Sequence, residues 1–101
     1  MIVEYTRYRI SEDRREAFIK GYEKAAEHLA ASPACLAYEL THCTEEPDRY
    51  ILRIKWKSTE EHIQGFRKEP GFRDFFQLVR PFFQDIEEMQ HYELTKVVHR
   101  T

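Results

Sequence analysis

The chain has 101 residues, which leaves room for one domain built around one small core. Its 16 Lys and Arg residues against 18 Asp and Glu residues give a formal net charge of -2, which supplies no positive field for nucleic acid or an anionic membrane. Apolar runs are far shorter than the roughly 18 residues of a membrane-spanning helix, and no basic-then-apolar secretion signal opens the chain. We therefore expect a cytoplasmic protein without nucleic-acid or membrane partners.

The first half of the chain predicts a strand, a long helix and two further strands. Residues 2–10 are apolar or aromatic on both parities, as in a strand covered on both faces. Ser11 is a candidate N-cap, and apolar residues at helical spacing continue from there to Ala31. Residues 35–44 and 49–57 alternate as strands on either side of the polar turn at 45–48. This half therefore predicts a β-α-β unit whose second strand opens a hairpin.

The second half predicts two helical segments and a last strand. Ser58-Thr59-Glu60-Glu61 is a capping box that opens a helix through about residue 68, where Pro70-Gly71 breaks it. A short helix follows over 72–79 and ends at Pro81, a strand covers 85–95, and 96–101 form a tail. The order β-α-β-β-α-β is that of the α+β ferredoxin-like fold, a four-stranded antiparallel sheet with both main helices on one face. We expect one such domain over residues 1–95.

The sheet face away from the helices is predicted to join two copies of the chain. It is expected to mix apolar and charged side chains: Val3, Tyr5, Ile51 and Met89 among Arg7, Arg53, Lys55, Glu87 and His91. Such a face is too apolar for a solvated sheet and too charged for a monomer core. A homodimer through this face, with ion pairs across it, explains both properties; the alternative is an ordinary mixed surface.

Nothing in the sequence predicts a nucleotide or metal site. The three glycines, Gly21, Gly65 and Gly71, do not form a phosphate-binding loop between a strand and a helix. Four histidines fall on different predicted elements without metal-ligand spacing: His42, His62, His91 and His99. Cys35 and Cys43 are too far apart along one strand to bridge each other, so each is expected to be an inert thiol. We expect no cofactor and no metal.

Aromatic residues make up 14% of the chain, which is generous for a core of this size. Six apolar side chains are predicted to share the layer between sheet and helices: Tyr22, Leu29, Trp56, Phe66, Phe72 and Phe76. This layer could bind a flat aromatic molecule, and the alternative is a plain aromatic core. Hydrogen bonds around such a pocket could come from Tyr38, His42, His91 and Arg73.

His62 is the candidate catalytic base. It precedes Phe66 by four residues and is therefore expected on the same face of the predicted helix. A neutral imidazole beside an apolar pocket has a pKa suited to accepting a phenolic proton near neutral pH. The alternative is a polar residue on an exposed helix surface.

Three segments resemble the antibiotic biosynthesis monooxygenase family, which comprises dimeric α+β barrel proteins such as quinol monooxygenases and haem-degrading relatives. They are YILRIKWKS at residues 50–58, EHIQGFR at 61–67 and Pro70-Gly71-Phe72. The resemblance implies oxygenation of a phenol or quinol without a cofactor, in a pocket where the substrate anion itself reduces dioxygen. It further implies that Trp56 lies at the pocket edge and that His62 corresponds to one of the histidines in the following helix.

Two positions depart from this resemblance. Phe66 stands where many family members have a histidine, and the first strand offers Tyr5, Thr6 and Arg7 in place of the asparagine of haem-degrading relatives. Haem degradation is therefore disfavoured. The sequence predicts a homodimeric, cofactor-independent monooxygenase acting on an aromatic phenol or quinol. The alternative, which Phe66 suggests, is a non-catalytic module of the same fold that binds a ligand or a partner.

Overall fold

The computed structural model describes residues 1–60 and 64–99 of the chain. The strands are β1 (Ile2–Arg9), β2 (Cys35–His42), β3 (Arg49–Trp56) and β4 (Ile86–Glu93). The helices are α1 (Arg15–Ala30) and α2 (Pro70–Val79), with short 3-10 turns η1 (Glu12–Arg14), η3 (Phe66–Lys68) and η4 (Arg80–Asp85).

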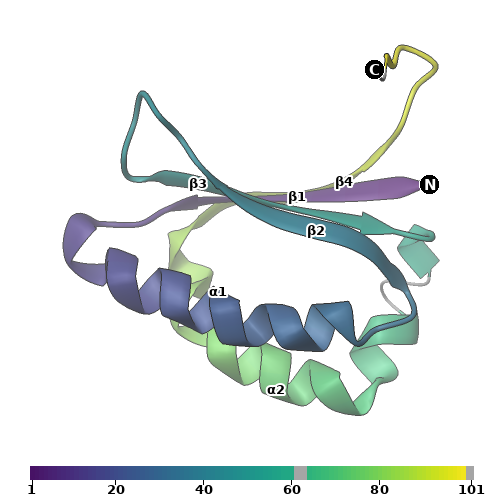
Figure 1. Ribbon diagram of the computed structural model, residues 1–101, viewed down its shortest axis with the longest axis horizontal. Coiled ribbons are helices and arrows are strands. Elements are labelled where there is room, and N and C mark those ends of the chain that lie inside the picture. The colour runs from purple at the N-terminus through teal and green to yellow at the C-terminus, as the bar shows by residue number, and fades with distance from the viewer. Residues whose placement is uncertain (61–63, 100–101) are drawn as a thin grey trace.

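The four strands form one antiparallel sheet in the order β2-β3-β1-β4. Both α-helices cover the same face of it, so the molecule has two layers (Figure 1). Because β1 pairs with both β3 and β4, it lies in the interior of the sheet and its helix-facing side chains reach the middle of the core. The predicted ferredoxin-like α+β fold is confirmed.

Phe18 of α1 lies at the centre of the core and is fully buried. Its ring centroid lies 4.9 Å from that of Tyr8, 5.2 Å from Tyr22, 5.0 Å from Tyr50 and 5.2 Å from Phe82. Alternation along β1 and β3 places Tyr8 and Tyr50 on the helix-facing side, where they are opposite each other in the strand register. The amphipathic pattern of α1 and the period of the strands therefore converge on one aromatic cluster.

Helix boundaries differ from the prediction at three places. Ser11 makes no side-chain capping bond, and α1 begins at Arg15 after the η1 turn. Pro70 is the first residue of α2 and not a break, because a proline at the first helical position lacks only an N–H that has no partner within the helix. Beyond Pro81 the chain continues as the η4 turn. The predicted helix over residues 58–68 falls partly outside the described residues.

A β-bulge in β4 reverses the predicted facing of two side chains. Ile86 lies opposite Tyr8 and Glu88 lies opposite Arg7, so Glu87 is an extra residue in the ladder. Each side chain beyond it is turned to the other face of the sheet. Met89 and His91 therefore lie on the helix-facing side, opposite Thr6 and Glu4, and their predicted place on the open face is wrong.

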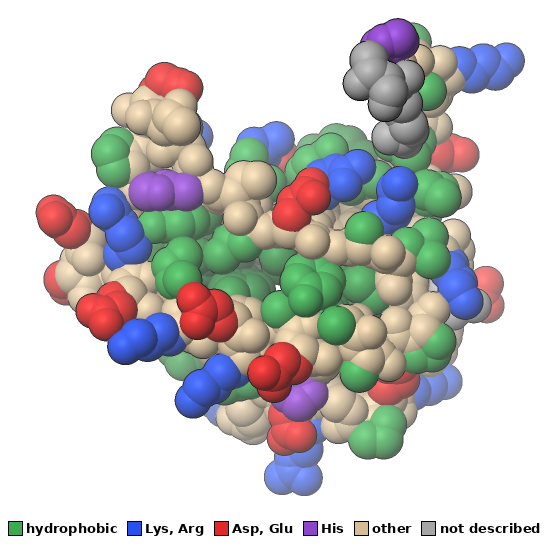
Figure 2. All heavy atoms as spheres, in the orientation of Figure 1, with side chains coloured by type: hydrophobic (Ala, Val, Ile, Leu, Met, Phe, Trp, Pro, Cys, Tyr) green, Lys and Arg blue, Asp and Glu red, His purple; other side chains and the backbone are tan. Residues whose placement is uncertain are grey.

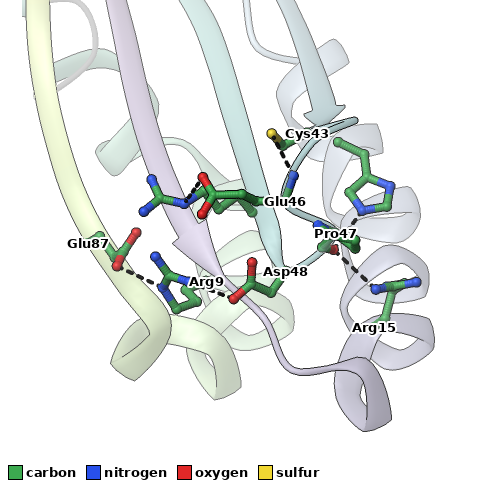
Figure 3. A network of polar contacts seen from close by, with 9 residues as sticks. Arg9, Arg15, Cys43, Glu46, Pro47, Asp48 and Glu87 are labelled. Atoms are coloured by element: carbon green, nitrogen blue, oxygen red, sulfur yellow. Dashed lines mark hydrogen bonds and ion pairs between the residues drawn. The ribbon is translucent and has the colours of Figure 1, made fainter.

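The turn between β2 and β3 is attached to three neighbouring elements (Figure 3). Arg9 of β1 donates from Nη1 to Oδ2 of Asp48 at 2.6 Å and from Nε to Oε2 of Glu87 at 3.1 Å. Pro47 O accepts a bond of 3.1 Å from Arg15 of α1 and lies 2.7 Å from Nε2 of His42. These side chains are exposed or half-buried, so the contacts fix the turn more than they stabilise the fold.

The open face of the sheet mixes apolar side chains with ion pairs. Tyr5 packs edge-on against Tyr92 with ring centroids 5.3 Å apart. Arg7 pairs with Glu88 at 3.0 Å and Arg53 with Glu39 at 3.3 Å.

Among the described residues, no helix is long and apolar enough to cross a membrane.

Candidate functional site

A cavity of about 350 Å³ lies between the helix-facing side of the sheet and α2. Five of the predicted pocket residues line it: Tyr22, Trp56, Phe66, Phe72 and Phe76. The rest of the lining comes from Glu4, Thr6, Tyr8, Leu52, Ile54, Arg67, Phe75, Val79, Phe83, Ile86 and Met89. The space is therefore walled by aromatic and aliphatic groups with a few polar groups, which is the usual composition of a site for a small organic ligand.

The aromatic wall follows from the spacing of residues in α2. Phe72, Phe75, Phe76 and Val79 occur at helical intervals of three and four, so they share one face of the helix. Phe66 of η3 is buried beneath them, with its ring centroid 5.4 Å from that of Trp56, 5.4 Å from Phe72 and 5.3 Å from Phe75. This arrangement gives the cavity a continuous wall of rings from β3 to α2.

One carboxyl group faces this apolar space. Glu4 of β1 is only 2% exposed, and its Oε1 accepts a hydrogen bond of 3.0 Å from Nε1 of Trp56. Burial raises the pKa of Glu4, an effect that the Trp56 bond and the charges of His91 and Arg67 oppose without cancelling. Glu4 was not predicted as a site residue; the available signal was an acidic residue between the apolar Ile2 and Val3 and the aromatic Tyr5 of the first strand.

The buried carboxyl predicts how stability responds to pH. Because the pKa of folded Glu4 is raised, its contribution to stability is fully present below the unfolded pKa and is lost as pH rises through the folded value. We expect the isosteric Glu4→Gln variant to gain stability relative to wild type between acidic and neutral pH. Urea unfolding of both proteins across this range measures the difference, and a difference that does not change with pH contradicts the prediction.

Two tyrosine hydroxyl groups supply further polar atoms to the cavity. The hydroxyls of Tyr8 and Tyr22 are hydrogen-bonded to each other within the core. Burial raises the pKa of Tyr8 to about 12 and holds the pKa of Tyr22 well above its usual value. Both groups therefore stay protonated near neutral pH and can act as hydrogen-bond donors.

Tyr38 and Arg73, which were also predicted to belong to the site, do not line this cavity. Tyr38 lines a second hollow, between α1 and β2, which adjoins the cavity because Tyr22 and Leu52 line both. Figure 2 shows hydrophobic side chains gathered there, with charged groups along the adjacent helix. Arg73 is exposed and is not among the residues that line the cavity, where Arg67 is the cationic group. His62 lies outside the described residues, so its role as base stays a prediction.

His42 and His91, two further histidines named from the sequence, each lie beside a side chain of a neighbouring strand. His42 stacks on Tyr50, with ring centroids 4.4 Å apart and an angle of 3° between the rings. His91 lies opposite Glu4 in the sheet. Within residues 1–60 and 64–99, no three His, Cys, Asp or Glu side chains come together as a metal site.

The family model of antibiotic biosynthesis monooxygenases matches residues 1–78. The chain belongs to this family. The match covers β1, β2, β3 and nearly all of α2, and it ends before β4. It therefore includes the greater part of the cavity lining.

Individual relatives have low sequence identity over nearly the whole chain. The uncharacterized protein YczJ of Bacillus subtilis is 24% identical over 93 residues, which cover 92% of this chain and 98% of the relative. A crystal structure from Bordetella bronchiseptica that carries the same family name has a TM-score of 0.78 at 23% identity, covering 93% of this chain and 96% of the other. SnoaB of Streptomyces nogalater, described as a cofactor-independent oxygenase, has a TM-score of 0.77 at 14% identity. The match covers 98% of this chain and 97% of SnoaB. At such identity the two structures show a shared fold.

Proposed function

We propose that the protein is a cofactor-independent monooxygenase that acts on an aromatic phenol or quinol. The observation that carries the proposal is the aromatic cavity, which has the size of a small-molecule site and contains a buried carboxyl group. Family membership supports monooxygenase chemistry, and the description of SnoaB as a cofactor-independent oxygenase supports the same chemistry without a cofactor.

The proposed reaction needs only a substrate that can supply all four electrons for dioxygen. A phenol with an oxidisable ring C–H loses its proton, and the resulting anion reduces O2. One oxygen atom becomes the new carbonyl oxygen of a quinone, and the other leaves as water with the two hydrogens that the substrate loses. The aromatic walls, among them Trp56 and Phe72, would orient the ring and exclude water. His62 is the candidate base that the sequence offers.

Oxygen consumption with a panel of quinols, naphthols and anthrone-like phenols tests the proposal. Isotopically heavy O2 should leave one labelled atom in the product and one in water. If His62 is the base, His62→Ala should lower kcat by about 10²- to 10⁴-fold, the usual contribution of a general base. Wild-type turnover no faster than that of His62→Ala contradicts this role of His62, and absence of oxygen consumption with every phenol contradicts the monooxygenase function.

The second candidate function is a non-catalytic module that binds a ligand or a partner through the same cavity. Phe66 favours it, because this ring lies buried against Trp56 at a position where many family members have a histidine. An aromatic ligand that raises the melting temperature but is recovered unchanged in air would support this function. Conversion of that ligand in air would count against it.

We propose further that the open face of the sheet joins two copies of the chain. Tyr5, Ile51 and Tyr92 present apolar surface there, surrounded by the pairs Arg7–Glu88 and Arg53–Glu39. A second copy of the same face fits this mixture, because a twofold axis can place each arginine near a carboxylate of the partner. The resemblance to dimeric α+β barrels supports the same assembly.

A further inference from the structure

We propose that Glu4, and not His62, accepts the phenolic proton of the substrate inside the cavity, an inference that rests on the proposed monooxygenase function. Among the described residues, Glu4 is the one carboxyl group that lines the cavity. A catalytic base must come within hydrogen-bond reach of the proton it accepts. Glu4 meets this requirement by position, because it belongs to the wall of the space that a bound phenol would fill.

The strand register places Glu4 in the interior of the sheet. It lies opposite Ile54 of β3 on one side and His91 of β4 on the other. Its Oε1 is oriented by the 3.0 Å bond from Nε1 of Trp56, a ring that also lines the cavity. The carboxyl group is therefore held by a partner that would itself contact the substrate.

The surroundings of Glu4 suit a proton acceptor. Polar and charged groups face it from several elements: Thr6 and Tyr8 on β1, Trp56 on β3, His91 on β4, Arg67 on η3 and Tyr22 on α1. The lining residues of α2 are apolar. Burial raises the pKa of the carboxyl toward the range in which a base is effective near neutral pH, while Arg67 and His91 favour its charged form.

The proton transfer balances within the proposed reaction. The phenolic O–H bond breaks, its electron pair stays on the substrate oxygen, and the proton forms a new O–H bond on the Glu4 carboxylate. The site then holds a neutral acid beside a phenolate, so two negative charges never share the apolar space. After O2 takes four electrons from the substrate, the proton leaves Glu4 with the second oxygen atom as water.

The Glu4→Gln variant tests the inference without removing the Trp56 contact, since the amide oxygen can still accept the indole hydrogen bond. We expect kcat to fall by about 10²- to 10⁴-fold and KM to change far less. The acidic limb of the pH profile of kcat/KM should disappear. Glu16→Gln is the matched control, because it makes the same change at an exposed carboxylate of α1, away from the cavity. An equal loss in Glu16→Gln, or wild-type kcat in Glu4→Gln, overturns the proposal.

A binding measurement separates this inference from the proposed function. At about pH 8 nitrophenolate carries no phenolic proton, so its binding beside a Glu4 carboxylate should draw one proton from solution. Calorimetry in two buffers of different ionisation enthalpy should give about one proton taken up by wild type and none by Glu4→Gln. Equal uptake in both proteins, or no uptake by wild type, overturns the role of Glu4. Absence of oxygen consumption with every phenol tested contradicts only the monooxygenase function.

Discussion

Replacing Phe18 by alanine is expected to lower the free energy of unfolding by about 3–5 kcal/mol, the usual cost of truncating a buried phenylalanine. The Phe18 ring is fully buried and contacts four other rings from β1, α1, β3 and η4. Its loss would leave a void between the sheet and the helical layer, which the surrounding rings cannot fill without leaving their own contacts. Folded domains have only about 5–15 kcal/mol in total, so most of the margin would be lost.

Urea unfolding and thermal melting measure this effect. Each kcal/mol lowers the melting temperature of a domain of this size by roughly 4–8 °C. Phe83→Ala is the control, because this ring is 40% exposed and packs against Phe76 of α2. The control should cost far less than Phe18→Ala. Equal losses for the two variants would show that the core is not centred on Phe18.

The sequence was sufficient to predict the fold because its periodic signals agree with one another. Alternation in β3 from Tyr50 to Trp56 matches the observed burial residue by residue. The spacing of the phenylalanines in α2 likewise predicts the aromatic wall. Where one face of an element is strongly apolar, the period alone determines which residues are buried.

Which side chains of β4 face the helices could not be predicted in the same way. Both parities of this strand carry charged and apolar residues, so alternation does not distinguish its two faces. The bulge at Glu87 depends on the ladder with β1 and on the contact with Arg9, both of which join residues about eighty positions apart. Met89 and His91 were placed on the wrong face for this reason.

Glu4 was missed because sequence patterns treat a charged residue as a mark of exposure. Burying a carboxyl group costs free energy unless hydrogen bonds or nearby charges compensate. Here the compensation comes from Trp56, fifty-two positions away, together with the charges of Arg67 and His91. A cost of this kind in the wall of an aromatic cavity is typical of a site selected for chemistry and not for stability.

The dimer proposed for the open face predicts a large effect of single substitutions on assembly. In a twofold interface each change occurs twice, so a cost of about 2 kcal/mol for burying a new polar group becomes about 4 kcal/mol. This corresponds to a roughly thousandfold weaker Kd for Ile51→Asp. Arg53→Glu should also weaken the dimer, because it replaces an arginine that the twofold axis would place near a carboxylate of the partner by a second carboxylate beside Glu39, with which Arg53 now pairs at 3.3 Å.

Light scattering and sedimentation over a range of protein concentrations measure this change. Ile51→Leu and Lys24→Asp are the controls: the first keeps an apolar side chain on the open face, and the second changes charge on the exposed surface of α1. Both controls should assemble as wild type does. An unchanged dimer in both Ile51→Asp and Arg53→Glu would reject this interface. If both variants dissociate and the separated subunits keep their activity, one subunit contains the complete site. This result is expected if Glu4 and the aromatic walls of one chain suffice for the reaction.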